Sequence, residues 1–287
     1  MVTPRILRRR IRSIQNTAKI TKAMEMIATA KMRRAQEQAL AGRPYAESIA
    51  RVIADLEAQP RGRYTSHPLL ESRDVKRIAI VYITSDRGLC GGLNANLNRL
   101  VGGFVLGQTL PVEFVAVGRK GRDFLFRTGQ NVKAEFTKMG DRPSLDDVTP
   151  ISRIVIDDYS SGHIDLVYVA YSRFVSTMLQ RPVMEPLLPV TPTAFAKGEP
   201  REYIYEPGPG FVLGQLVPRF VEMEVYHAIL EAIASEQAAR MVAMRSATDN
   251  ASDIIRELTL MLNKARQEMI TTELLDITGG AEALAKT

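Results

Sequence analysis

The chain has 287 residues, of which 45% are hydrophobic and 24% charged, an ordinary composition for a globular protein. Its net charge of +6 admits a nucleic acid, an anionic membrane surface or an acidic protein as a partner. Cys90 is the only cysteine, which excludes an intrachain disulfide, and the apolar run at 78–83 is too short to span a membrane. We therefore expect a globular protein of a reducing compartment.

Residues 5–41 contain no glycine or proline and predict a long basic helix, with Thr3 as its N-cap and Pro4 in its first turn. The first 24 residues hold seven Lys or Arg and no acid, as in a targeting peptide, but the helical pattern runs on, so we expect a retained helix. The tripeptide at 42–44 predicts a break before a second helical stretch at 45–59. The apolar residues expected to share one face are Ile6, Ile11, Ile14, Ile20, Met24, Ile27 and Ala28.

The middle of the chain changes to short β-branched runs separated by helical patterns. Strands are predicted at 76–85, 111–118, 131–138 and 164–171, with helices at 93–106, 119–128 and 144–159. This alternation predicts a Rossmann-like α/β domain, assigned to residues 74–195, with a mostly parallel sheet. The proline-rich stretch 181–210 reads as an extended connection, and we assign residues 196–212 to that connecting segment.

The third part is a sixty-residue stretch, 219–278, without glycine or proline, bracketed by Pro218 and Gly279. As one helix it would be roughly 90 Å long, whereas a compact chain of this size is about 50 Å across. Such a helix must project from its own domain and needs a partner. We assign residues 213–287 to this C-terminal helix.

The C-terminal helix carries a coiled-coil pattern with one stutter. Its predicted seam consists of Met223, Tyr226, Leu230, Ile233, Gln237, Met241, Met244, Thr248, Ala251, Ile255, Leu258, Leu262, Ala265 and Met269. The partner available within the chain is the N-terminal helix, assigned to residues 1–60, and an antiparallel pairing would place its arginines near the acid-rich stretch 249–276. Since the seam is small or polar from 237 to 251, we expect another protein to surround part of this rod.

The segment Thr84–Asn94 (TSDRGLCGGLN) follows a predicted strand and precedes a predicted helix. Its glycines could cradle a phosphate, but it matches neither the dinucleotide-binding nor the P-loop pattern, so a tight turn is favoured. The three histidines are scattered and Cys90 has no histidine near it in sequence. We predict no catalytic, cofactor-binding or metal site. A nucleotide-dependent enzyme that uses the α/β domain and a basic coiled-coil protein that binds nucleic acid stay open as alternatives.

Four sequence blocks resemble one family. These are residues 16–34 (NTAKITKAMEMIATAKMRR), the TSDRGLCGG turn, residues 234–250 (ASEQAARMVAMRSATDN) and residues 263–277 (NKARQEMITTELLDI). In this order they closely resemble the gamma subunits of bacterial F-type ATP synthases, and the stretch 203–207 (YIYEP) is similar to the family's segment before the C-terminal helix.

The resemblance implies a non-catalytic rotor subunit without a cofactor. In that family the terminal helices form an antiparallel coiled coil inside a ring of three alpha and three beta subunits, and the α/β domain lies against the epsilon subunit and the membrane-embedded c ring. Proton-driven rotation of the c ring then drives ATP synthesis at the beta subunits. The resemblance implies one copy per complex, no nucleic-acid partner, and a peripheral location on the cytoplasmic face of a bacterial plasma membrane, reached only through the complex.

The resemblance also implies which residues contact partners. Those expected to face the alpha and beta subunits are Arg8, Arg9, Arg10, Met24, Arg240, Arg266, Gln267 and Thr271. Those expected at the foot, near the epsilon subunit and the c ring, are Tyr203, Tyr205 and Glu206.

Overall fold

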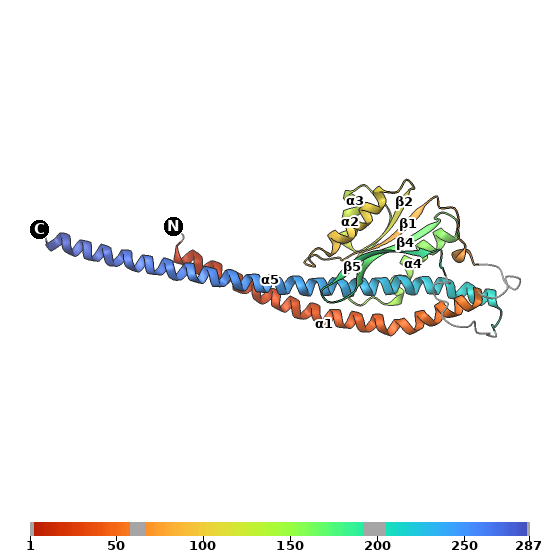
Figure 1. Cartoon of the computed structure of the whole chain (residues 1–287), viewed down its shortest axis with the longest axis horizontal. Helices are drawn as coiled ribbons and strands as arrows, with labels where there is room; N and C mark the ends of the chain where they lie inside the picture. The colour runs from red at the N-terminus through yellow and green to blue at the C-terminus, as the bar shows by residue number, and fades with distance from the viewer. Residues whose placement is uncertain (1–2, 58–66, 192–204, 286–287) are drawn as a thin grey trace. The chain divides into compact units, whose positions relative to one another are not determined.

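The computed structural model describes residues 3–57, 67–191 and 205–285, which form two compact units. Residues 28–240 form one unit, and residues 1–27 together with 241–287 form the other. The elements, most of which carry labels in Figure 1, are α1 (Pro4–Glu57), the short 3₁₀ turn η1 (Pro68–Leu70), β1 (Ile78–Ile83), α2 (Leu93–Leu106), β2 (Val112–Val117), α3 (Arg119–Arg127), β3 (Asn131–Phe136), α4 (Leu145–Ser160), β4 (Leu166–Phe174), β5 (Gln180–Leu188) and α5 (Pro209–Ala285).

The unit of residues 28–240 is built on a five-stranded sheet in the order β3-β2-β1-β4-β5. The first four strands are parallel, and β5 pairs antiparallel with β4 at the edge. All six residues of β1 are buried, as expected for a central strand that helices cover on both faces. The predicted α/β fold with a mostly parallel sheet is therefore confirmed.

Alternate residues of β1 belong to two hydrophobic clusters. Ile78, Ile80 and Tyr82 pack with α2 and α3 on one face of the sheet. Ala79, Val81 and Ile83 pack on the other face with α4 and with the parts of α1 and α5 that belong to this unit. The long helices are thus part of the core here, because α5 buries a nearly continuous apolar face between residues 213 and 230.

Within residues 28–240 the two long helices run antiparallel. A Cβ atom built on Gly42 of α1 would lie 4.0 Å from Cε of Met223 on α5. Tyr45, three residues further along α1, interacts with Arg219, four residues earlier on α5. Positions that advance along one helix therefore meet positions that recede along the other.

The unit of residues 1–27 and 241–287 is a second helix pair. The hydroxyl oxygens of Thr21 and Thr248 are 2.7 Å apart and form a hydrogen bond between α1 and α5. Leu7, Ala251 and Leu258 are buried in this unit. Every described side chain of α5 from Arg266 onward is exposed, so the last turns of the helix have no partner among the described residues.

Three local predictions were wrong. Strand β5 lies where we expected an extended connection; it holds Pro182 and Pro186 but is an edge strand, where a missing N–H costs least. Helix α1 continues through residues 42–44, because the flanking turns bury Ala46, Ile49 and Ala50 in the core. Helix α5 likewise passes through Pro218, whose neighbours Val217 and Phe220 are buried, and it passes through Gly279 as well.

The predicted face of α1 was half right. Ile11 and Ile14 are half-buried and Ala28 is buried, but Ile6, Ile20 and Ile27 are exposed by 49%, 61% and 56%. Leu7 and Thr21, one residue along from two of these isoleucines, occupy the helix pair instead. Helix α5 therefore packs against a face of α1 that is shifted by one residue from the predicted face. Ile6, Ile20 and Ile27 are left exposed.

Candidate partner-binding surfaces and the polar network of the turn

The end of α5 presents an apolar surface that nothing described in the chain covers. Ile270, Leu274 and Ile277 are exposed by 50%, 57% and 68%. Their spacing of four and three residues places them on one face of the helix. A soluble protein seldom leaves such a stripe in water, and a partner that covers it would gain the free energy of burying it.

Three predicted contact residues lie beside this stripe. Arg266, Gln267 and Thr271 are all exposed on α5. The Thr271 hydroxyl donates a hydrogen bond of 2.9 Å to the Gln267 carbonyl in the preceding turn, as threonine often does within a helix. The guanidinium of Arg266 and the amide of Gln267 are therefore the groups best placed for a partner.

The start of α1 presents a second exposed surface, which is strongly basic. Arg8, Arg9 and Arg10 are exposed, and consecutive positions point about 100° apart around a helix, so the positive charge is spread around it. Met24 is half-buried, whereas Met26, two residues further along the helix, is exposed by 66%. This end of the helix suits an acidic or apolar partner.

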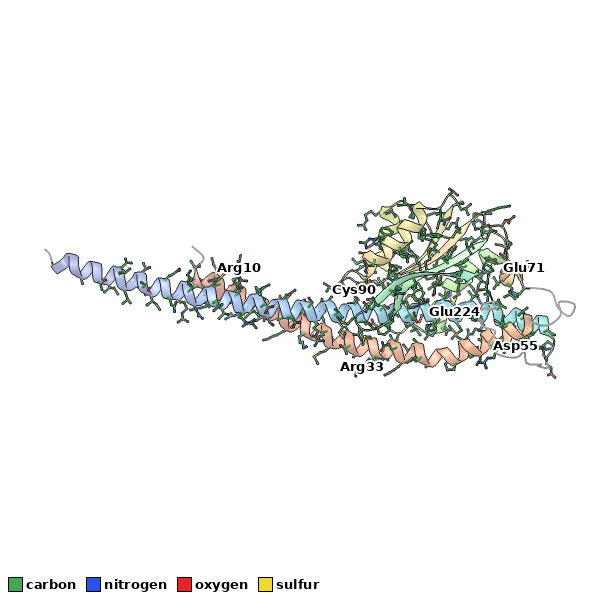
Figure 2. All side chains as sticks on the ribbon, viewed as in Figure 1. Arg10, Arg33, Asp55, Glu71, Cys90 and Glu224 are labelled. Carbon is green, nitrogen blue, oxygen red and sulfur yellow. The ribbon has the colours of Figure 1, made fainter. Side chains whose placement is uncertain are left out.

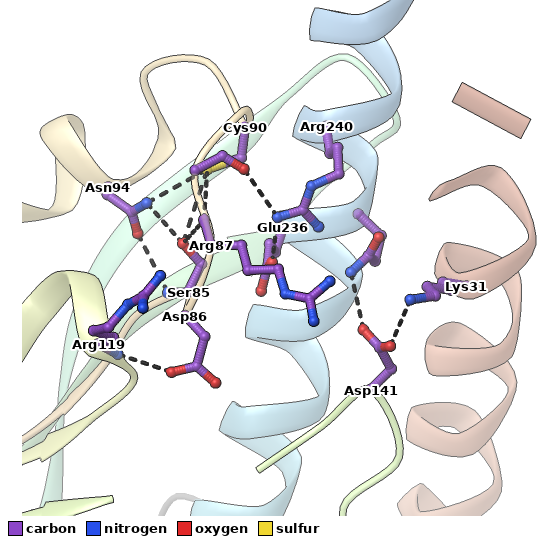
Figure 3. A network of polar contacts seen from close by, with 12 residues as sticks. Lys31, Ser85, Asp86, Arg87, Cys90, Asn94, Arg119, Asp141, Glu236 and Arg240 are labelled. Carbon is purple, nitrogen blue, oxygen red and sulfur yellow. Dashed lines mark hydrogen bonds and ion pairs between the residues drawn. The ribbon is translucent and has the colours of Figure 1, made fainter. Parts of the chain in front are cut away.

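Arg240 lies in a different environment from the other predicted contact residues. Its side chain is 10% exposed and forms an ion pair of 2.6 Å with Glu236 one turn earlier on α5. The same guanidinium donates a hydrogen bond of 3.2 Å to the Gly88 carbonyl (Figure 3). Burial raises the pKa of the Glu236 carboxyl, and the charge of Arg240 opposes that rise. The main contacts of Arg240 in this structure are therefore with its own chain.

The glycine-rich turn after β1 is filled by its own polar groups. The Asn94 amide donates to the Ser85 hydroxyl at 2.8 Å, and that hydroxyl donates to the Arg87 carbonyl at 2.8 Å. Cys90 is 2% exposed beneath them, and burial raises the pKa of its thiol. These contacts match the predicted tight turn.

Asp86 joins this turn to two neighbouring elements. Its carboxylate accepts a hydrogen bond of 2.9 Å from the backbone N–H of Arg119, at the start of α3. It accepts another of 2.9 Å from the backbone N–H of Lys138, just after β3. Figure 3 shows this side chain next to Arg119. Nothing in the sequence pattern indicated its role.

The predicted foot is only partly described. Tyr203 lies outside the described residues. Tyr205 is half-buried and packs against the cluster on the α4 side of the sheet, while Glu206 is exposed. The structure therefore offers Glu206 to a partner more readily than Tyr205.

Two of the histidines are engaged in contacts within the chain. His67 caps η1, where its Nδ1 accepts a hydrogen bond of 3.2 Å from the Leu69 N–H, and His163 lies 3.1 Å from Arg77. Among residues 3–57, 67–191 and 205–285, no group of His, Cys, Asp and Glu side chains could hold a metal ion. None of the described helices is both long enough and apolar enough to cross a membrane.

Comparisons with known proteins agree on one family. A family model described as ATP synthase matches residues 3–284. An ATP synthase gamma chain of Dehalococcoides mccartyi is 61% identical over 99% of this chain and 100% of its own length, and one of Chloroflexus aurantiacus is 47% identical over 99% of each chain.

Solved structures show the same fold. One chain of the central stalk and c-ring of the Tetrahymena thermophila mitochondrial ATP synthase is 25% identical, with a TM-score of 0.62 over 79% of this chain and 99% of its own. A chain of the Euglena gracilis mitochondrial enzyme, at 19% identity, has a TM-score of 0.67 over 98% of this chain and 94% of its own. The chain belongs to the ATP synthase gamma chain family.

Proposed function

We propose that this chain is the rotor subunit in the central stalk of an F-type ATP synthase, where it couples rotation of the c ring to ATP synthesis at the beta subunits. In this role it would be a non-catalytic subunit of the complex. The observation that carries the proposal is the exposed apolar end of α5, on a chain that resembles gamma chains over nearly its whole length.

The two helix ends are suited to a surrounding ring of alpha and beta subunits. The stripe of Ile270, Leu274 and Ile277 would lie against an apolar part of the ring. The arginines at 8–10 would meet acidic loops of the ring, and Met24, Arg266, Gln267 and Thr271 would add contacts nearby. Pairing of α1 and α5 as an antiparallel coiled coil would keep both ends inside the ring.

The shaft would act on the beta subunits as a ligand with different contacts to each of three conformations. Because it is asymmetric, each orientation would favour one conformation at each catalytic site. The α/β domain, with Tyr203, Tyr205 and Glu206, would face the epsilon subunit and the c ring. In such a complex the protein would lie peripherally on the cytoplasmic face of a bacterial plasma membrane, held there only through the other subunits, and proton flow would turn the c ring.

Co-purification tests the assembly. A tagged chain should elute with alpha and beta subunits at one copy per three of each, together with epsilon and the c ring. A chain that elutes without them would contradict the proposal and would reopen the nucleotide-dependent enzyme or the nucleic-acid-binding protein.

A matched pair of substitutions tests the contact surface. Leu274 and Phe126 are almost equally exposed, at 57% and 59%, but lie on α5 and on α3. Leu274→Asp should lower ATP-driven proton pumping in membrane vesicles severalfold, because a partner would have to bury the new charge. Phe126→Asp makes the same chemical change on the α/β domain and should leave pumping near the wild-type value. Equal effects of the two would count against the proposed ring contact.

A further inference from the structure

Two loops from the same edge of the sheet reach helix α5 at neighbouring positions. The turn after β1 meets α5 where the Gly88 carbonyl accepts the hydrogen bond from Arg240. The loop after β3 meets it where the Asp141 carboxylate accepts a hydrogen bond of 3.4 Å from the Gln237 side chain. Gln237 and Arg240 are three residues apart, so the two contacts lie on one face of the helix.

Asp141 also reaches the other long helix. Its second carboxylate oxygen lies 2.6 Å from the Lys31 ammonium on α1 (Figure 3). One carboxylate therefore contacts α1 and α5 at the same time. The Lys31 and Asp141 side chains are 34% and 47% exposed, so this ion pair adds little to the folding stability of the unit.

The two loops are held to each other by Asp86. Its carboxylate binds the backbone N–H of Lys138, three residues before Asp141, and belongs to the turn that carries Gly88. The negative charges of Asp141 and Asp86 add to the rise that burial causes in the pKa of the Glu236 carboxyl. We call this set of contacts between the two loops and the two helices the polar collar; it comprises Lys31, Asp86, Gly88, Asp141, Glu236, Gln237 and Arg240.

Most of the buried apolar side chains of the two long helices beside the polar collar are small, with Met32 as the larger exception. Ala28 and Ala35 on α1 and Ala234 and Ala238 on α5 are all buried. Small side chains allow helices to pack closely but interlock little, so they resist rotation of a helix about its axis less than large side chains do. Hydrogen bonds and ion pairs are directional and can fix that rotation.

The polar collar lies at the limit of its unit along both helices. The boundary between the units falls between residues 27 and 28 of α1 and between residues 240 and 241 of α5. Lys31 lies one turn inside the first boundary, and Arg240 is the last residue before the second. The polar contacts of the α/β domain with the two long helices therefore lie next to the boundaries of this unit on α1 and on α5.

We propose that Asp141 is a positioning residue that fixes the rotational setting of α1 and α5 relative to the α/β domain, so that torque passes from the domain to the helices through the polar collar. This inference rests on the proposed rotor function. Arg240 provides a second link between α5 and the α/β domain, since its guanidinium donates a hydrogen bond to Gly88 in the turn after β1. The role concerns coupling between rotation and catalysis rather than the folding of the domain.

Charge reversal and exchange in the assembled complex test this role. Asp141→Lys places two ammonium groups together and should lower the ratio of protons pumped to ATP hydrolysed by about threefold or more, at unchanged subunit composition. Lys31→Asp combined with Asp141→Lys restores opposite charges and should recover at least about half of the lost coupling. Asp158→Lys is the matched control, because Asp158 and Lys133 form an ion pair of the same 2.6 Å elsewhere in the domain, and it should leave the ratio unchanged.

The outcomes separate this inference from the rotor function. The inference would be overturned if Asp141→Lys kept the wild-type ratio of protons pumped to ATP hydrolysed. It would also be overturned if Lys31→Asp combined with Asp141→Lys recovered no coupling. In both cases the wild-type complex would still pump, so the rotor function would stand. If Asp141→Lys prevents assembly, Asp141→Asn decides, since it keeps the size of the side chain and removes only the charge; an unchanged ratio would again overturn the inference. Failure of the wild-type chain to co-purify with alpha and beta subunits would instead refute the rotor function.

Discussion

The two units of this chain bury different kinds of side chain. The sheet unit fully buries large residues such as Tyr82, Phe114 and Tyr159. The terminal helix pair buries fewer side chains, and a hydrogen bond between Thr21, which is buried, and Thr248, which is half-buried, joins its two helices. Figure 2 shows side chains crowded around the sheet. Since apolar burial dominates folding stability, we expect the sheet unit to be the more stable of the two.

This difference agrees with the division of labour in a rotor. The α/β domain has to stay folded as a rigid body while it turns, and its two hydrophobic clusters provide that rigidity. Under the proposed function the helix ends would fit a partner that changes shape, and their exposed isoleucines, leucines and methionines suit such a surface. The few buried side chains between the two terminal helices are therefore consistent with helices whose apolar residues largely face outward.

The largest predicted effect breaks the sheet unit at Gly118. This residue has φ +92°, and a Cβ atom there would lie 2.1 Å from the Thr84 carbonyl oxygen. Gly118→Ala should lower the free energy of unfolding by at least about 3 kcal/mol, measured by urea unfolding of the purified chain.

The control for this substitution is a helical glycine in the same unit. A Cβ atom on Gly103 of α2 would meet nothing within 4 Å. Gly103→Ala should be neutral or stabilising by up to about 1 kcal/mol, since alanine favours the helix. Equal destabilisation by the two substitutions would show that the tight approach at Gly118 is not what the structure describes.

The second prediction compares a leucine from each unit. Leu97 on α2 is 1% exposed in the cluster beneath the sheet, so Leu97→Ala should cost about 2–5 kcal/mol of unfolding free energy. Leu262 on α5 is only half-buried in the terminal unit, and Leu262→Ala should cost less than about 1 kcal/mol in the isolated chain. Urea unfolding followed by circular dichroism measures both, and similar losses would show that the terminal helix pair is as firmly packed as the sheet.

The sheet unit was also the more predictable of the two. The predicted helix at 93–106 coincides with α2, and the other predicted strands and helices of the domain end within a few residues of the observed ones. Strand β5 was missed because a single sequence does not show which strand lies at an edge, where proline is tolerated. Prolines and glycines also misplaced the limits of the long helices, because tertiary packing outweighs local preference there.

The candidate sites were predictable only where a family motif named them. Arg266, Gln267 and Thr271 lie on an exposed helix end, as a contact role requires, although their contacts stay a prediction. Nothing in the sequence indicated that Asp141 would meet Lys31, since 110 residues separate them. Apolar periodicity also did not distinguish the face of α1 that packs against α5 from the neighbouring face, whose isoleucines are exposed.

The smallest predicted effect concerns a charged group inside the stable unit. Glu224 on α5 lines a cavity of about 660 Å³ together with Arg173, Glu185, His227 and Glu231. Burial raises the pKa of the Glu224 carboxyl; His227 opposes the rise, while Glu185 and Glu231 add to it. Glu224 is therefore a half-buried ionisable group at the wall of this cavity in the sheet unit.

The sign of the pH dependence follows from this raised pKa. The folded chain holds a proton on Glu224 at pH values where the unfolded chain has already lost it, so stability falls as the pH rises from about 4.5, the ordinary value, through the raised pKa. Glu224→Gln removes this loss and should flatten the stability–pH curve above pH 4.5, measured by thermal unfolding between pH 5 and 8. Glu257→Gln, at an exposed position of the same helix, should leave the curve unchanged. A curve for Glu224→Gln that matches the wild type would mean that this carboxyl is solvated in the cavity, and the sheet unit would then tolerate charge as readily as the terminal helices do.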